Sequence, residues 1–154
     1  MTACQPPEPL TEPYTIESGT TCALDGMLLM DYPGPKAQIH FAGQSTPDFF
    51  CDTVEMFNVL LNPEQIREVK AVYVQDMGIA DWITPKDAWI DARTAFYVSG
   101  SRKAGSMGTT FASFAKQSDA EAFVVSFGGE VLTFDQFKAD MARLDGGALH
   151  DTRM

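Results

Sequence analysis

The fold is decided by the stretch Met27-Leu28-Leu29-Met30-Asp31-Tyr32-Pro33-Gly34-Pro35-Lys36-Ala37-Gln38-Ile39-His40-Phe41 (residues 27–41). Two short runs rich in apolar residues, 27–30 and 37–41, flank the sequence Pro33-Gly34-Pro35. Pro and Gly in this order form tight turns, and short apolar runs on both sides of a turn are typical of strands. The stretch therefore predicts a strand, a turn and a second strand.

A helix and a third strand are expected to follow. Residues 48–61 carry an apolar face, Thr46-Pro47 supplies an N-cap and a residue suited to the first helical position, and Asn62-Pro63 ends the helix. Residues 69–74 then alternate between outward and inward positions as a strand does. The predicted order over residues 22–75 is β-β-α-β.

The same order of elements recurs in the second half. We predict a helix that opens at Ser118 and ends at Gly128-Gly129, together with strands at residues 89–98 (one or two), 109–115 and 130–134. The sequence thus predicts an α+β fold of two related β-β-α-β units, which we interpret as an internal duplication. The expected segments are an N-terminal tether at 1–13, a first unit at 14–85, a second unit at 86–145 and a disordered tail at 146–154.

Composition and charge restrict the function. The chain of 154 residues is 45% hydrophobic and 21% charged, which is typical of one compact domain or two small ones. Its formal net charge of −10 argues against a nucleic-acid binder and against adhesion to anionic membranes, because both need basic clusters. Residues 1–62 contain eight acidic residues and one basic residue, Lys36. This half is suited to attract cations or a basic partner, or it serves solubility alone.

The N-terminus resembles the end of a bacterial lipoprotein signal. The sequence contains no run of 18 or more apolar residues and no complete signal peptide. Thr2-Ala3-Cys4 matches the small residues and the cysteine that close a lipobox, so Cys4 is the predicted lipid anchor. The Pro-rich residues 5–13 predict a stiff tether of about 30–40 Å when extended. The alternative is an ordinary N-terminus that happens to contain a cysteine.

The other two cysteines have different surroundings. Cys51 lies in the predicted apolar helix, where a small buried side chain is a more common role than that of a ligand. Cys22 lies in an irregular stretch that contains glycine, which sets it apart from a periodic core position. A Cys22–Cys51 disulfide is an alternative in an oxidising compartment, although three cysteines without regular spacing do not make a disulfide framework.

Sulfur side chains at these positions favour monovalent copper. Cys22 and Met27 lie a short loop apart, and Met107 stands between glycines where no apolar neighbour makes it a core position. Thiolate and thioether ligands select Cu(I), whereas zinc prefers four closely paired nitrogen or sulfur ligands, and the sequence has no CxxC or HxxxH. His40 is a further candidate ligand. The alternatives are core packing for Met27 and Met30 and a structural role for His40.

The sequence resembles the NosL family, the accessory lipoproteins of nitrous oxide reductase, over residues 22–137. Its family motifs occur in family order, namely Cys22 to Met27, Tyr32 to Ile39, Ala88 to Ala92, Tyr97 to Ser101, Met107-Gly108 and Ser118 to Phe123. The resemblance implies two related β-β-α-β units. It also implies a periplasmic Cu(I)-binding chaperone, held at the membrane by its lipidated cysteine. Such a chaperone would supply the copper centres of nitrous oxide reductase and interact with an ABC-type maturation machinery.

The resemblance further implies which residues bind copper. Cys22 matches the family's cysteine and is the implied thiolate ligand, and Met27 and Met107 match its methionines as thioether ligands. The chain departs from the family's Cys-Gly-Met spacing, because residues 23–25 are inserted before Gly26. This departure makes His40 or Met30 a substitute ligand for Met27.

Two other classes of protein compete with this interpretation. An enzyme needs a nucleophile beside a general base, and two histidines in the whole chain give little support for a Cys–His pair, so no enzymatic activity is expected. A metal-independent docking module would use the acidic first half of the chain. That module predicts partner binding that depends on salt and is indifferent to copper.

Overall fold

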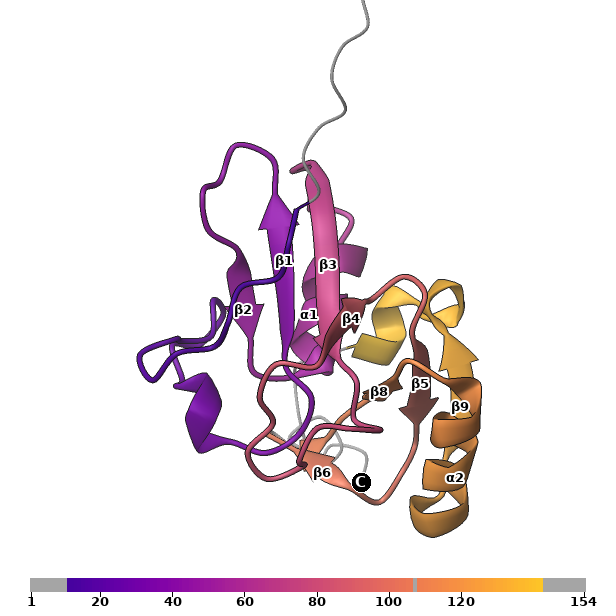
Figure 1. Cartoon of the computed structure of the whole chain (residues 1–154). Coiled ribbons are helices and arrows are strands. Elements are labelled where there is room, and N and C mark those ends of the chain that lie inside the picture. The colour runs from indigo at the N-terminus through magenta and orange to yellow at the C-terminus, as the bar shows by residue number, and fades with distance from the viewer. Residues whose placement is uncertain (1–10, 107, 143–154) are drawn as a thin grey trace, which may run out of the picture.

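The structure is a computed structural model of the chain and describes residues 11–106 and 108–142. It has the α+β fold that the sequence predicts (Figure 1). The strands are β1 (Ala37–Phe41), β2 (Asp48–Phe50), β3 (Val69–Gln75), β4 (Trp89–Asp91), β5 (Phe96–Ser99), β6 (Ala104–Gly105), β7 (Gly108–Thr109), β8 (Ala112–Phe114) and β9 (Glu130–Thr133). The helices are α1 (Thr53–Leu61) and α2 (Gln117–Phe127), with 3-10 turns at Leu29–Asp31, Phe134–Gln136 and Ala139–Ala142.

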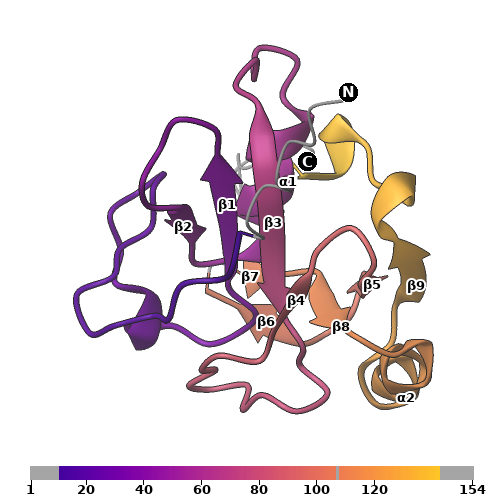
Figure 2. The ribbon, with the colours of Figure 1, turned by 45° about the horizontal axis from the view of Figure 1, so that its top comes forward.

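The strands form two main antiparallel sheets, each packed against one helix. The first sheet has the order β2-β1-β3-β4, and the second has the order β8-β5-β9. Figures 1 and 2 show α1 behind the first sheet and α2 beside the second. The sets β2-β1-β3 and β8-β5-β9 share one strand order, and in each the helix precedes the last strand. The internal duplication itself stays a prediction.

One core joins the two halves. Phe57 of α1 stacks on Phe137 with ring centroids 4.2 Å apart, and it also contacts Tyr97 of β5 edge-on. Tyr97 is fully buried and donates a hydrogen bond from its hydroxyl to the carbonyl oxygen of Ala92 at 2.6 Å. The second unit was expected to begin at residue 86. However, β4 (Trp89–Asp91) follows that position and pairs with β3 of the first sheet, so a boundary there does not separate the two sheets.

The first helix begins later than the sequence predicts. Residues 48–50 form the edge strand β2, which pairs with β1, and α1 begins at Thr53. Asp52 is the N-cap, because its carboxylate accepts a hydrogen bond from the backbone N–H of Val54 at 3.0 Å. The predicted end at Asn62 is confirmed. A run such as Phe49-Phe50 fits a strand or a helix equally well, and pairing with β1 decides between them.

The apolar run at residues 27–30 is also not a strand. It enters a 3-10 turn at Leu29–Asp31, and its one bridge in the described part of the chain joins Thr21 to Leu28. The strands predicted at 37–41, 69–74 and 130–134 are confirmed as β1, β3 and β9. The region 109–115 is divided, because β7 pairs with β6 while β8 pairs with β5. Neither α1 nor α2 has both the length and the apolar character needed to cross a bilayer, nor does any other described helix.

Candidate metal site

A short hairpin positions Cys22. The backbone N–H of Cys22 donates to the carbonyl oxygen of Met27 at 2.8 Å, and the N–H of Gly26 donates back to Cys22 at 2.9 Å. Gly26 has φ +77°, a left-handed conformation that side-chain-bearing residues rarely adopt. Asp25 closes the turn by accepting a hydrogen bond from the N–H of Met27 at 3.0 Å. Residues 23–26 thus form a turn that keeps Cys22 and Met27 paired.

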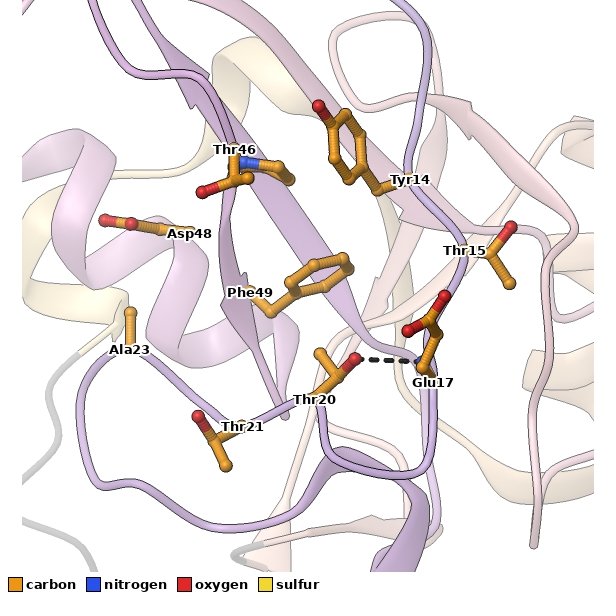
Figure 3. Close-up of a pocket in the computed structure, with 10 residues that line it drawn as sticks. Tyr14, Thr15, Glu17, Thr20, Thr21, Ala23, Thr46, Asp48 and Phe49 are labelled. Carbon is orange, nitrogen blue, oxygen red and sulfur yellow. Dashed lines mark hydrogen bonds between the residues drawn. The ribbon is translucent and has the colours of Figure 1, made fainter.

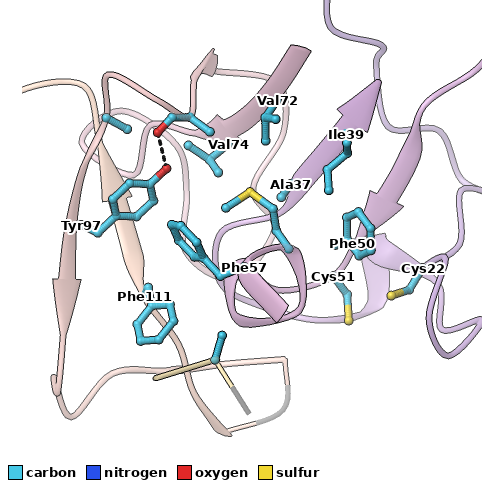
Figure 4. Packing of buried hydrophobic residues seen from close by; sticks show 14 of the residues in the cluster. Cys22, Ala37, Ile39, Phe50, Cys51, Phe57, Val72, Val74, Tyr97 and Phe111 are labelled. Carbon is cyan, nitrogen blue, oxygen red and sulfur yellow. Dashed lines mark hydrogen bonds between the residues drawn. The ribbon is translucent and has the colours of Figure 1, made fainter. Parts of the chain in front are cut away.

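The thiol of Cys22 lies beside a second thiol and a carboxyl group. Its Sγ is 3.0 Å from Oε1 of Glu55, and Sγ of Cys51 is 3.2 Å from the same oxygen. Both cysteines are free and buried, and they lie side by side at the end of the core away from Tyr97 (Figure 4). Ligand atoms of Cys22, Asp25, Cys51 and Glu55 lie within 4.8 Å of one another. We call these four residues the Cys22–Cys51 cluster.

The groups of the cluster change one another's pKa values. A hydrogen bond from Cys51 lowers the pKa of Cys22 to about 6. The same bond, together with burial, raises the pKa of Cys51. Burial and the hydrogen bond to Cys22 raise the pKa of Glu55 to about 8. Cys22 is therefore the more acidic of the two thiols and the first to form a thiolate. A thiolate is the form that binds metal ions.

A buried lysine lies under the cluster. The ammonium group of Lys36 donates hydrogen bonds to the carbonyl oxygens of Tyr32, Pro33 and Cys51 at 2.8, 3.0 and 3.2 Å. Burial lowers the pKa of Lys36 to about 8, and the negative groups of the cluster oppose that change. Lys36 thus keeps a positive charge near neutral pH and offsets the charge of a thiolate beside it.

The segment between β6 and β8 reaches the cluster from the second half of the chain. The hydroxyl of Ser106 lies 3.3 Å from Sγ of Cys51. Asp52 accepts a hydrogen bond from Thr110 at 2.5 Å, and Thr53 donates to the carbonyl oxygen of Phe111 at 2.7 Å. The N-terminus of α1 therefore holds Thr110 and Phe111 close to the cluster.

The structure brings together some of the predicted site residues and leaves others apart. Cys22 and Met27 are paired across the hairpin, whereas Met30 is 40% exposed. His40 is outside the Cys22–Cys51 cluster, because its Nε2 lies 2.7 Å from Oε1 of Gln38 and its ring lies between two tyrosines. Cys4 and Met107 lie outside the described residues.

Sequence reasoning missed Cys51 and Glu55 as site residues. The apolar neighbours of Cys51 indicated a core position, and its burial confirms that part of the interpretation. The available signal was Glu55, an acidic residue on an apolar helical stretch one turn after Cys51. A carboxyl group is seldom buried without a partner, so its presence indicates other polar groups nearby.

A separate open groove lies on the outer side of the hairpin. Its volume is about 680 Å³, and Figure 3 shows it between the segment at Tyr14–Thr21 and the β2 edge. Thr21 and Ala23 line it, whereas Cys22 between them points into the core. Glu17 and Asp48 give the groove an acidic character. Neither Cys22 nor Met27 nor His40, the predicted copper ligands within the described residues, lines it.

Fold and site together define a small α+β protein with a buried, thiol-rich candidate site for a soft metal ion. The NosL family model matches residues 13–142, so the chain belongs to the NosL family. This confirms the resemblance found in the sequence.

Two relatives and two solved structures agree with this assignment. The copper-binding lipoproteins NosL of Stutzerimonas stutzeri and Achromobacter cycloclastes are 37% and 44% identical. These matches cover 91% and 69% of this chain, and 75% and 57% of the relatives. The crystal structure of the copper chaperone NosL from Shewanella denitrificans has a TM-score of 0.80 at 39% identity, covering 86% of this chain and 98% of that one.

The solution structure of apo-NosL from A. cycloclastes has a TM-score of 0.52 at 35% identity, covering 69% of this chain and 87% of that one. The names of these relatives describe copper-binding proteins and a chaperone, not enzymes, in agreement with the expectation that the chain is not an enzyme.

Proposed function

We propose that this protein is a periplasmic chaperone for Cu(I), anchored to the membrane through a lipid on Cys4. It supplies copper for the assembly of the copper centres of nitrous oxide reductase and works with the ABC-type maturation machinery of that enzyme. Membership of the NosL family supports the proposal, as do the names of relatives that are called copper-binding lipoproteins and a copper chaperone.

The observation that carries the proposal is the environment of Cys22. Its thiol is free, the hydrogen bond from Cys51 lowers its pKa, and the ammonium of Lys36 lies 3.2 Å from the carbonyl oxygen of the adjoining Cys51. Met27 is hydrogen-bonded to it through the backbone and is the first thioether ligand that we propose, with Met107 as the second. Soft ligands of this kind prefer Cu(I) to harder divalent ions. We leave His40 out of the ligand set, because its imidazole is engaged by Gln38.

Copper is the cargo of this site, and its transfer proceeds by ligand exchange. A site with one thiolate and weakly bound thioethers can accept a ligand from the acceptor before it loses its own. Copper then moves from one protein to the other without entering solution as a free ion. The exposed Leu24 and Asp25 place the hairpin at the surface, so an acceptor that displaces the hairpin would reach the buried Cys22.

The test is an anaerobic titration of the reduced protein with Cu(I) against a chromophoric chelator. We expect one tight site per chain, its loss in Cys22→Ser and weaker binding in Met107→Ala. Met30→Leu is a matched control, because Met30 is an exposed methionine near the hairpin. Equal affinity in the wild type and Cys22→Ser would refute the copper site.

A metal-independent docking module is the second candidate, and the acidic groove favours it. A module of this kind would bind its partner through Glu17 and Asp48. It predicts binding that weakens as salt increases and that is the same with and without copper. Pull-down of the reductase by copper-loaded and copper-free protein at two salt concentrations separates the two functions.

A further inference from the structure

Cys51 has a polar environment that a purely structural cysteine does not need. Its sulfur lies 3.2 Å from Glu55 Oε1 and 3.3 Å from the Ser106 hydroxyl, and it is within 4.8 Å of the Cys22 sulfur. A buried cysteine that only fills space behaves as a small hydrophobe. Here three polar groups from separate segments converge on the sulfur.

Cys22 and Cys51 form a pair that one ion can bridge. The sulfur atoms of Cys22 and Cys51 lie 3.0 and 3.2 Å from the same oxygen, Oε1 of Glu55. Glu55 therefore holds the two sulfur atoms around a common point. From this geometry we infer that Cys51 is a second thiolate ligand and that Cu(I) binds between the sulfur atoms of Cys22 and Cys51. The inference rests on the proposed copper function and adds a ligand to it.

The charges around the pair suit this arrangement. Cu(I) with two thiolates carries one negative charge, and the thiol protons leave to the solvent when the ion binds. The ammonium of Lys36 supplies one positive charge, and it lies 3.2 Å from the carbonyl oxygen of Cys51. Lys36 thus offsets the charge of the copper ion with its two thiolates, which lowers the cost of burying it.

The two cysteines are held to different degrees. Cys51 stands between β2 and the N-cap Asp52, and its carbonyl group is bound by Lys36, so its backbone is held on both sides. Cys22 lies on the surface hairpin, next to exposed residues. Cys51 is therefore the internal ligand, and Cys22 is the ligand that an acceptor reaches first.

The first test needs no substitution at the site. In protein labelled with selenomethionine, the thioether ligands scatter as selenium, so any sulfur that scatters near copper is cysteine. X-ray absorption at the copper edge of the Cu(I)-loaded protein is expected to give two sulfur neighbours. One sulfur neighbour would overturn the inference and leave Cys22 as the single thiolate.

The second test compares affinities. Cys51→Ser and Cys51→Ala are each expected to bind Cu(I) more than about 100-fold more weakly, since removing even a second-shell partner of a metal ligand costs about 10–100-fold. Met56→Leu is the control for a buried sulfur residue, on the helix that follows Cys51, and it should leave the affinity unchanged. Circular dichroism shows whether each variant is folded.

The outcomes separate the inference from the proposed function. If Cys51→Ser and Cys51→Ala bind like the wild type while Cys22→Ser does not, Cys51 is a packing residue and the chaperone function stands. If Cys22→Ser also binds like the wild type, both fail. If the Cys51 variants do not fold, the sulfur count in the labelled wild type decides.

Discussion

Replacing Asp52 tests how the N-terminus of α1 holds the cluster. Asp52 is 2% exposed, caps α1 through Val54 and accepts a hydrogen bond from Thr110 at 2.5 Å. In Asp52→Ala the lost cap costs about 1 kcal/mol. The buried Thr110 hydroxyl loses its main acceptor and keeps only the Thr53 hydroxyl at 3.3 Å, which costs about 1–2 kcal/mol more. The expected total is about 2–3 kcal/mol.

Asp52→Asn is the matched control. The asparagine side chain can still cap the helix and accept from Thr110, so its effect should stay below about 1 kcal/mol. Urea unfolding followed by circular dichroism measures the free energy of unfolding of both variants. In thermal unfolding, Asp52→Ala should have a Tm about 4–12 °C lower, at about 2–4 °C per kcal/mol. The reasoning is refuted if Asp52→Ala loses less than about 0.5 kcal/mol, or if both variants lose the same amount.

The same pair gives a pH dependence with a definite sign. Burial raises the pKa of Asp52 above its ordinary value of 3.8, so above that value the folded state binds more protons than the unfolded state. The stability that Asp52 contributes therefore falls as the pH rises. The asparagine side chain does not titrate, so Asp52→Asn should gain stability relative to the wild type as the pH rises above the ordinary pKa of 3.8. If the difference in free energy of unfolding between Asp52→Asn and the wild type does not change with pH, Asp52 is not a buried carboxyl group with a raised pKa.

Three further predictions concern the core, a glycine contact and a histidine. Tyr97→Phe leaves the carbonyl oxygen of Ala92 without its donor and should cost about 1–2 kcal/mol, whereas Tyr14→Phe, which loses an exposed bond to Ser45, should cost less than about 0.5 kcal/mol in the same unfolding assay. Gly34→Ala should destabilise more than Gly43→Ala by about 1–3 kcal/mol: both have positive φ, but only at Gly34 would the new Cβ lie 2.7 Å from Gly105 Cα. Comparable losses of stability in Gly34→Ala and Gly43→Ala would show that the backbone at Gly105 moves away from the new Cβ. Burial lowers the pKa of His40, so its NMR titration should fall below its ordinary value of 6.5, and its contribution to stability should decrease as the pH drops through that range. His40→Gln should leave the Cu(I) affinity within about threefold of the wild type, and a larger loss would restore His40 as a ligand.

Local sequence patterns determined much of the fold. The apolar run beside Pro33-Gly34-Pro35 predicted β1, and alternation at residues 69–74 predicted β3, because a strand exposes successive side chains on opposite faces. Asn62-Pro63 and Gly128-Gly129 predicted the ends of α1 and α2, because each breaks the helical hydrogen-bond pattern locally. These features depend on neighbours in the chain and can be inferred without the rest of the molecule.

Elements with ambiguous local patterns were decided by tertiary contacts. Residues 48–50 became a strand because β1 supplies backbone partners on their side. Residues 27–30 became part of a hairpin and a 3-10 turn, because the segment folds back to pair with Thr20 and Cys22 instead of joining a sheet. Short apolar runs carry no information about which partner will be available.

The sequence by itself determined the α+β class, the NosL resemblance and Cys22 as the candidate thiolate. Only the tertiary structure placed Cys51 and Glu55 beside it, because Cys22 and Glu55 are 33 positions apart and the hairpin must pack against β2 before they meet. A cysteine in an apolar run is the same in sequence whether its sulfur contacts carbon atoms or another thiol. The difference arises from long-range packing, which brings two thiols and a carboxyl group into one small buried volume.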